Sequence, residues 1–327
     1  MKRITTVALT LLLLIPPVVS PAAKARFEKV TDHFYWLQLQ ADGPGVGAVV
    51  TDGGVLLVNP PAQPQLSDVL GALKAVTSKP LNWVVNTDYS YERDGASNEL
   101  AQQGAAIFES KALRRLAGRK VETPNLVAGS KDKEGTSDGK ARETAQRLVF
   151  DRQVRVFPDN LEVRVFALQS PAHTGGDVVV FIPAEKVLIV GDLFTAGSYP
   201  VIDREPGGGS ATGWLDGMKQ AIDAVPLLKS TMPQPKPDPT KPPPEEKTLA
   251  ELIVVVPGHG LRSNLQEMKD MLEVAQKLVS EVSRAASRGR NREALTSWPS
   301  ASPYRAYSNL DAFVGVLSDE LIARKAK

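Results

Sequence analysis

Two periodic patterns of hydrophobic and polar residues, one typical of strands and one typical of helices, alternate along this chain. Apolar residues at every second position, or in short unbroken runs, predict strands, and apolar residues three or four positions apart predict helices. In 161–168, for example, apolar positions alternate with Glu162 and Arg164, which indicates a strand, whereas Leu66, Val69 and Leu73 indicate a helix. The predicted strands lie at 27–40, 46–59, 81–87, 105–108, 148–157, 161–168, 178–182, 187–190 and 252–256. The predicted helices lie at 65–77, 95–103, 110–117, 211–225 and 309–324.

One more helix is predicted before the last one. Ser263 and Gln266 form a capping-box pair at its start, and apolar residues from Leu265 to Val282 give it a single hydrophobic face. The whole order is strands, helix, strands, helix, in two similar halves. This order predicts an α/β (α+β) fold of the αββα type, in which two sheets lie face to face with helices outside.

The first 25 residues are predicted to be a secretory signal peptide. Lys2 and Arg3 precede an apolar run at 7–19, and Ala23-Lys24-Ala25 offers a small-x-small cleavage site. The apolar run is short for a membrane span and contains Pro16-Pro17, so we expect cleavage and no stable membrane insertion. A periplasmic or secreted location follows from this interpretation.

Charge and composition narrow the classes of partner. Loss of the signal peptide removes three basic residues and no acidic ones, so the formal net charge falls from +2 to −1. A net charge this close to zero does not favour nucleic acid as a partner. We therefore expect the partner to be a small-molecule ligand or an unknown protein. The chain has no cysteine, which excludes disulfides, thiolate nucleophiles and thiolate metal ligands.

The remaining chain is predicted to form a domain at 26–289 and a C-terminal extension at 290–327 that packs on it. The domain contains a polar stretch at 129–145, which indicates a surface loop. It also contains a segment at 229–247 with seven prolines, which indicates an extended, solvated insertion.

Four polar motifs follow predicted strands. They are Asn86-Thr87-Asp88-Tyr89-Ser90-Tyr91-Glu92-Arg93, Ser170-Pro171-Ala172-His173-Thr174-Gly175-Gly176, Gly191-Asp192-Leu193-Phe194 and Pro257-Gly258-His259-Gly260. Two of the chain's three histidines lie in them. The third, His33, is remote in sequence from the motifs, and we interpret it as a satisfied surface histidine.

Together with "GVGAVVTDGGVLLVN" before them, these ordered motifs resemble the metallo-β-lactamase superfamily. The resemblance implies an αββα sandwich with a metal site at one edge and, in most members, hydrolytic activity. The family motif His-x-His-x-Asp-His supplies ligands to two metals. The four corresponding positions here are Asp88, Ser90, Glu92 and Arg93.

Three later ligand positions match the family, namely His173, Asp192 and His259. The resemblance therefore gives Asp88, His173, Asp192 and His259 as candidate metal ligands, and Asp88, Glu92 and Arg93 as candidate catalytic residues. Asn59 stands where the family usually has a supporting Asp. Arg93 has donors only and cannot ligate a cation, so a second metal is not expected.

Two functional alternatives follow from these substitutions. In the first, the site is degenerate, and the protein is non-catalytic and binds a ligand or partner. In the second, Asp88, His173 and Asp192 hold one metal, and the protein hydrolyses an ester, thioester or lactone, with Arg93 stabilising the developing oxyanion. For the cofactor, the sequence leaves open one divalent metal (Zn or Mn) or none.

Overall fold

The computed structural model describes residues 25–40, 43–89, 91–116, 147–205, 207–225, 249–296 and 304–325, with only the backbone of 91–95, 249 and 296. The predicted signal peptide (1–24 of its 25 residues), the polar loop at 129–145 and the proline-rich insertion at 229–247 lie outside these residues.

The first sheet contains seven strands in the described part of the chain, and their order in space follows the sequence, from β1 to β7. The β1–β4 strands pair antiparallel, and β4 to β7 pair parallel. The strands are β1 (Glu28–Lys29), β2 (Phe34–Gln38), β3 (Gly45–Thr51), β4 (Gly54–Val58), β5 (Leu81–Val85), β6 (Ala106–Ser110) and β7 (Arg147–Phe150).

The second sheet contains six strands among the described residues, in the order β13-β12-β11-β10-β9-β8. Its strands pair antiparallel except for β11 and β12, which run parallel. The strands are β8 (Gln153–Val156), β9 (Val163–Ala167), β10 (Val178–Ile182), β11 (Val187–Gly191), β12 (Val254–Pro257) and β13 (Ser263–Asn264).

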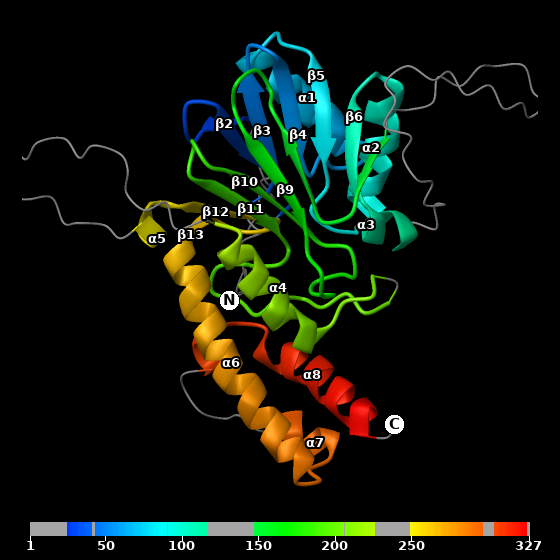
Figure 1. The fold of residues 1–327 in the computed structure, drawn as a ribbon, viewed down its shortest axis with the longest axis vertical. Helices are drawn as coiled ribbons and strands as arrows, with labels where there is room; N and C mark the ends of the chain where they lie inside the picture. The colour runs from blue at the N-terminus through cyan, green and yellow to red at the C-terminus, as the bar shows by residue number, and fades with distance from the viewer. Residues whose placement is uncertain are drawn as a thin grey trace, which may run out of the picture.

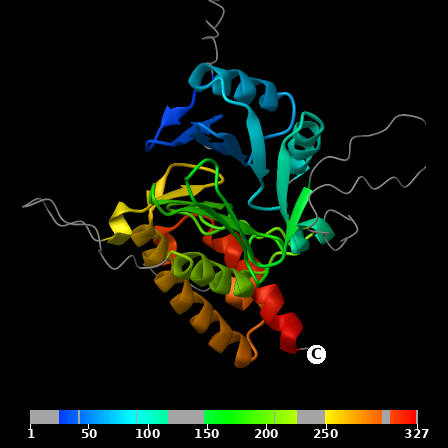
Figure 2. The ribbon, with the colours of Figure 1, turned by 45° about the horizontal axis from the view of Figure 1, so that its top comes forward.

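Helices cover the outer face of each sheet, so the fold has four layers (Figures 1 and 2). Among the described helices, none is both long and hydrophobic enough to cross a bilayer. They are α1 (Gln65–Val76), α2 (Tyr91–Gln102), α3 (Lys111–Leu116), α4 (Ala211–Asp223), α5 (Leu249–Leu252), α6 (Leu265–Ser287), α7 (Arg292–Thr296) and α8 (Leu310–Lys325), with a 3-10 turn η1 (Tyr304–Ala306).

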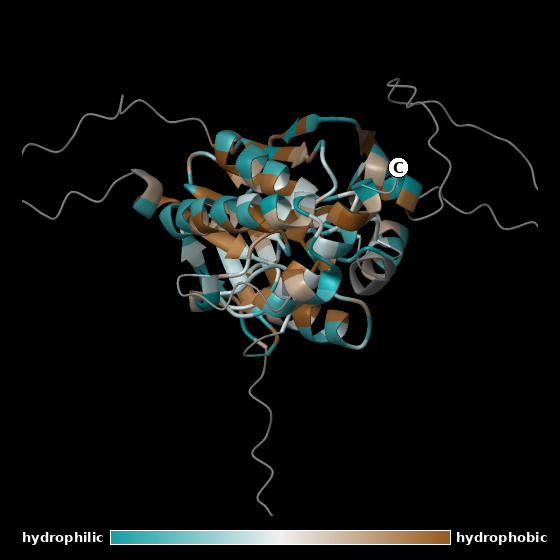
Figure 3. Cartoon of the chain, turned by 90° about the horizontal axis from the view of Figure 1, so that it is seen from below, coloured by the Kyte–Doolittle hydropathy of each residue, from teal (hydrophilic) through white to brown (hydrophobic). Residues whose placement is uncertain are grey.

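Four buried clusters fill the spaces between these layers in the described part of the chain, and one of them packs α2 and part of α1 against β5 and β6. Phe34, Val85 and Ile189 belong to the cluster between the sheets. A second cluster joins the first sheet to α1, and the largest joins the second sheet to α4, α6 and α8. The eight predicted apolar-face residues of α6, from Leu265 to Val282, are all buried. In Figure 3 the helices alternate between hydrophilic and hydrophobic residues along their length, as expected for helices with one face on a sheet.

Some predicted element boundaries are wrong. The predicted strand at 148–157 is two strands, β7 and β8, which belong to different sheets. Phe150 and Val156 are both buried between the sheets, so the hydrophobic pattern continues while the chain crosses at Asp151 and Arg152. Similarly, 27–40 is interrupted between β1 and β2.

Two helix starts also differ. The side chain of Asn264, not Ser263, caps α6 by accepting a hydrogen bond from the Glu267 backbone N–H, because α6 begins at Leu265 and Asn264 is the residue directly before it. Helix α2 begins at Tyr91, earlier than the predicted 95, and this places Glu92 and Arg93 in its first turn.

The polar motifs lie at one edge of the sandwich. The β11 and β12 strands run parallel, so their carboxyl ends lie together, and backbone hydrogen bonds join the two sheets there. Gly45 N donates to Gly258 O at 2.8 Å, and Val178 N donates to Thr87 O at 2.6 Å. The residues that follow β5, β11 and β12 therefore meet at this edge.

Candidate metal centre

Asp88, His173 and Asp192 lie together at this edge. One ligand atom from each lies within 4.8 Å of the others. Asp88 follows β5, His173 lies in the loop between β9 and β10, and Asp192 follows β11 directly. The first sheet thus supplies one carboxylate, and the second supplies a carboxylate and an imidazole. Asp88 and His173 are buried, and Asp192 is partly exposed.

The turn before Asp88 is braced by two side chains. The Asn59 Oδ1 atom accepts a hydrogen bond from the Thr87 backbone N–H at 2.8 Å, and the Thr87 hydroxyl lies 3.0 Å from Asp88 Oδ2, to which it donates. Gly191 packs against this turn with a φ of 56°, and a Cβ there would lie 2.0 Å from the Thr87 Oγ1 atom. Only glycine fits this approach.

His173 has a defined ring orientation. Its Nδ1 atom lies 2.7 Å from the Val201 carbonyl oxygen, so Nδ1 carries the proton and donates it to that carbonyl. The Nε2 atom lies 3.7 Å from Asp192 Oδ2. A histidine whose Nδ1–H is held by a carbonyl presents the Nε2 lone pair, which is the usual arrangement of a metal-ligating imidazole.

Acidic neighbours change the protonation of this region. Burial lowers the pKa of His173, but the negative charges of Asp88, Asp177 and Asp192 together outweigh it and raise that pKa above its ordinary value. Burial also raises the pKa of Asp177 to about 7, although Thr174 donates hydrogen bonds to its carboxylate. The cluster therefore attracts positive charge, whether a proton or a cation.

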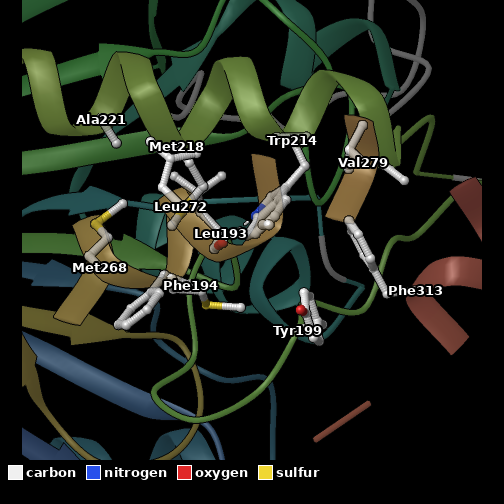
Figure 4. Packing of buried hydrophobic residues seen from close by; sticks show 14 of the residues in the cluster. Leu193, Phe194, Tyr199, Trp214, Met218, Ala221, Met268, Leu272, Val279 and Phe313 are labelled. Atoms are coloured by element: carbon white, nitrogen blue, oxygen red, sulfur yellow. Dashed lines mark hydrogen bonds between the residues drawn. The ribbon is translucent and has the colours of Figure 1, made fainter. Parts of the chain in front are cut away.

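Three neighbours in the described part of the chain help to position Asp192. Its Oδ1 atom lies 2.8 Å from the Nδ1 atom of His259. A Cβ at position 258 would lie 2.0 Å from the same oxygen, so Gly258 leaves the space that the carboxylate occupies. On α4, the Trp214 indole N–H donates to the carbonyl of Leu193, the next residue, at 2.7 Å. Figure 4 shows Trp214 beside Leu193 in the buried cluster.

The candidate residues from the sequence divide into three groups. Asp88, His173 and Asp192 converge, whereas His259 contacts the other oxygen of Asp192 and is not one of the converging atoms. Glu92 and Arg93 lie in the first turn of α2, where only the backbone is described, and Ser90 lies outside the described residues. The Val201 carbonyl and Trp214 were not predicted, and a backbone carbonyl has no sequence signal.

The donor set fits one divalent cation. Ligands about 2.1 Å from a tetrahedral metal lie about 3.4 Å from each other, close to the 3.7 Å between His173 Nε2 and Asp192 Oδ2. One imidazole and two carboxylates suit zinc, and the oxygen-rich set also suits manganese. With neutral His173, two carboxylates balance the charge of one divalent ion.

Comparisons with a family model and with solved structures indicate the same family. The model of the metallo-beta-lactamase superfamily matches residues 47–259. Among solved structures, a metallo-beta-lactamase from Pontibacter korlensis has a TM-score of 0.54 at 16% identity, over 77% of this chain and 99% of that one. Comparison with curated proteins gives no match.

Two further solved structures are similar. The DIM-1 metallo-beta-lactamase has a TM-score of 0.53 at 16% identity, over 78% of this chain and 98% of that one. The metallo-beta-lactamase FIM-1 from Pseudomonas aeruginosa, in its mono-zinc form, has a TM-score of 0.53 at 17% identity, over 78% of this chain and 96% of that one. At these identities the likeness concerns the fold.

Proposed function

Since the chain belongs to the metallo-β-lactamase superfamily, we propose that it is a divergent hydrolase that binds one divalent cation, Zn or Mn, through Asp88, His173 and Asp192. Its substrate class is an ester, thioester or lactone. This is the second of the two alternatives that the sequence left open. A β-lactam is not proposed as substrate, because the four positions of the family's main motif all differ here.

The convergence of three ligand atoms within 4.8 Å carries this proposal. The hydrogen bond from His173 Nδ1–H to the Val201 carbonyl supports it further, because it leaves the Nε2 atom facing Asp192 with its lone pair available to a cation. The solved mono-zinc form of FIM-1 supports the view that this fold accommodates a single metal.

Each residue has a separate task in the proposed reaction. Asp88, His173 and Asp192 would hold the divalent cation, which would supply Lewis-acid chemistry and lower the pKa of a water molecule toward neutral pH. Asp88 and Asp192 supply the negative charge that holds the cation, and the Val201 carbonyl keeps His173 in the ligating tautomer. His259 has a side chain that is 41% exposed, and it donates to Asp192. Its Nε2, which carries no proton in this tautomer, would first accept the proton released by the attacking water and then pass it to the leaving group.

The predicted signal peptide supports a further part of the proposal, that the mature chain acts in the periplasm or outside the cell. Sequencing the N-terminus of the protein recovered from that fraction tests it, since cleavage is expected after residue 25.

Metal stoichiometry and hydrolysis test the proposed function together. Mature protein dialysed against Zn or Mn should retain about one ion per chain by elemental analysis, and should hydrolyse simple esters, thioesters or lactones only when loaded. His173→Ala should lose both the ion and the activity. The matched control is His33→Ala, at the opposite end of the strands, which should keep both. Wild-type protein without bound metal, or equal metal in His173→Ala, would contradict the proposal.

A further inference from the structure

The imidazole of His173 is held by a loop that joins β11 to α4. The Val201 carbonyl accepts the Nδ1–H of His173, and the Asp203 backbone N–H donates to the His173 carbonyl at 2.9 Å. The position of the ring therefore depends on where this segment, 197–203, lies. No strand of either sheet contains the segment, so something else must fix it.

The start of α8 fixes one end of the segment. Asn309 Nδ2 donates to the carbonyls of Tyr199 and Pro200 at 3.1 and 3.3 Å. The Tyr199 N–H donates to the Ser308 carbonyl at 3.0 Å. The Tyr199 ring, 1% exposed, stacks on Phe313 of α8 with 5.2 Å between centroids. Figure 4 shows these two rings side by side. The residues immediately before Val201 are thus attached to α8.

Glu320, near the other end of α8, makes a second attachment. Its carboxylate accepts hydrogen bonds from the backbone N–H groups of Ala211 and Thr212 at 2.7 and 3.1 Å, and from the Ser210 hydroxyl at 3.1 Å. A carboxylate at a helix N-terminus is stabilised by these unpaired N–H groups. The Ser210 N–H in turn donates to the carbonyl of Ala172, the neighbour of His173.

We propose that Asn309 and Glu320 are positioning residues for His173, so that α8 sets the metal-ligating geometry. Both lie outside the region 47–259 that matches the family model. Replacing the direct hydrogen-bond partner of a metal ligand typically changes metal affinity by about 10- to 100-fold, and Asn309 and Glu320, which act one contact further out, should give the lower end of that range. The part of this inference that concerns the cation rests on the proposed function, and the part that concerns the imidazole does not.

Asn309→Gly is the most selective variant. Asn309 has a φ of 60°, which glycine adopts freely, so the substitution removes the amide without straining the backbone. Glu320→Gln is the second variant, in case the first does not fold. Val69→Ala, in the buried cluster under α1, is the matched control, because it removes core contacts far from α8.

Two readouts are needed, and the first requires no metal. The full chain, labelled with ¹⁵N-histidine, contains only three histidines, so the His173 ring is resolved by NMR. Exchange of its Nδ1–H with water should be about tenfold faster in Asn309→Gly than in wild type, because the Val201 carbonyl loses its anchor. The second readout is the dissociation constant for Zn or Co(II), which should rise about tenfold. The Co(II) absorption spectrum should change with it.

The outcomes separate the two proposals. The inference is supported if Asn309→Gly and Glu320→Gln speed exchange and weaken binding while Val69→Ala, though less heat-stable, does neither. Wild-type exchange and affinity in both α8 variants would overturn it, as would the same changes in Val69→Ala. If wild-type protein binds no metal, the proposed function fails, and the exchange rate still decides whether α8 positions His173.

Discussion

The two ends of the second sheet both pair an imidazole with a carboxylate, but in different ways. At the end away from the candidate site, Glu185 lies in the turn between β10 and β11. It accepts from His33 Nδ1 at 2.6 Å and from the His33 backbone N–H at 3.4 Å. Burial raises the pKa of Glu185, but hydrogen bonds from Thr31 and His33 outweigh it and lower that pKa below its usual value. This acid is satisfied by the protein's own donors.

At the site end, acids surround the imidazole. Asp88 and Asp192 each direct an oxygen toward the point that His173 Nε2 also faces, and with Asp177 they raise the pKa of His173. The far end is thus a hydrogen-bonded pair that joins the two sheets, whereas the site end is a set of ligand atoms arranged around one point. His33, which we interpreted from the sequence as a satisfied surface histidine, has a side chain that is 46% exposed and is hydrogen-bonded to Glu185.

The largest effect should come from crowding the site end. In Gly258→Ala, the new Cβ would lie 2.0 Å from Asp192 Oδ1 and displace the carboxylate, so cation affinity should fall about 10- to 100-fold. Titration with Zn or Mn measures it. The control is Gly71→Ala, in α1, where a Cβ meets nothing within 4 Å. It should keep wild-type affinity and raise stability by up to ~1 kcal/mol. Equal affinities in the two variants would contradict this.

A smaller effect is expected from Trp214→Phe. The variant loses the 2.7 Å hydrogen bond to the Leu193 carbonyl, next to Asp192, and leaves that buried oxygen without its donor. Unfolding by denaturant should show a loss of about 1–3 kcal/mol, and cation affinity should weaken as well. Trp83→Phe, on β5 of the first sheet and only partly buried, should leave affinity unchanged. An unchanged affinity in Trp214→Phe would show that α4 does not help to position Asp192.

The smallest effect is expected on stability, and it depends on the pH and on Glu185 at the end of the sheet away from the candidate site. The folded-state pKa of Glu185 lies below its ordinary value of 4.5, so the stabilisation by Glu185 is present above pH 4.5 and is lost as pH falls through the folded pKa. Glu185→Gln should therefore lower stability by at most ~1 kcal/mol at neutral pH, and the difference should vanish in acid. Thermal unfolding across pH measures this. A stability difference that persists in acid would contradict this assignment. Cation affinity should not change in Glu185→Gln, because Glu185 lies in the β10–β11 turn, at the end of the sheet away from the cluster.

Much of this fold could be predicted because buried strands and amphipathic helices keep their periods. The face of α6 and the hairpin of β10 and β11 follow from the pattern alone. The division of 148–157 into β7 and β8 could not be predicted, since its residues face one interior from both sheets. The alternation of buried and exposed side chains along a strand can be read from the sequence. The point at which the chain passes from one sheet to the other cannot, because the buried residues on both sides of it face the same interior.

For the candidate site, the sequence predicted the ligands but not the groups that hold them in place. Asp88, His173 and Asp192 were candidates because the ordered motifs resemble those of the metallo-β-lactamase superfamily, and the structure brings the three residues together. The supports were not found, because a carbonyl such as that of Val201 is available at every residue. Asn309 lies 136 positions beyond His173, and only the folded chain shows that they are connected.

The strand order has a consequence for how the protein is made. Each sheet is built from a continuous part of the chain, β1 to β7 and then β8 to β13, so the first sheet can assemble while the second half is still being synthesised. Asp88 belongs to the early half, and His173 and Asp192 to the late half. A chain that has folded only halfway therefore has a single carboxylate of the cluster and cannot capture a metal ion prematurely. Cation binding would then report that both halves have docked.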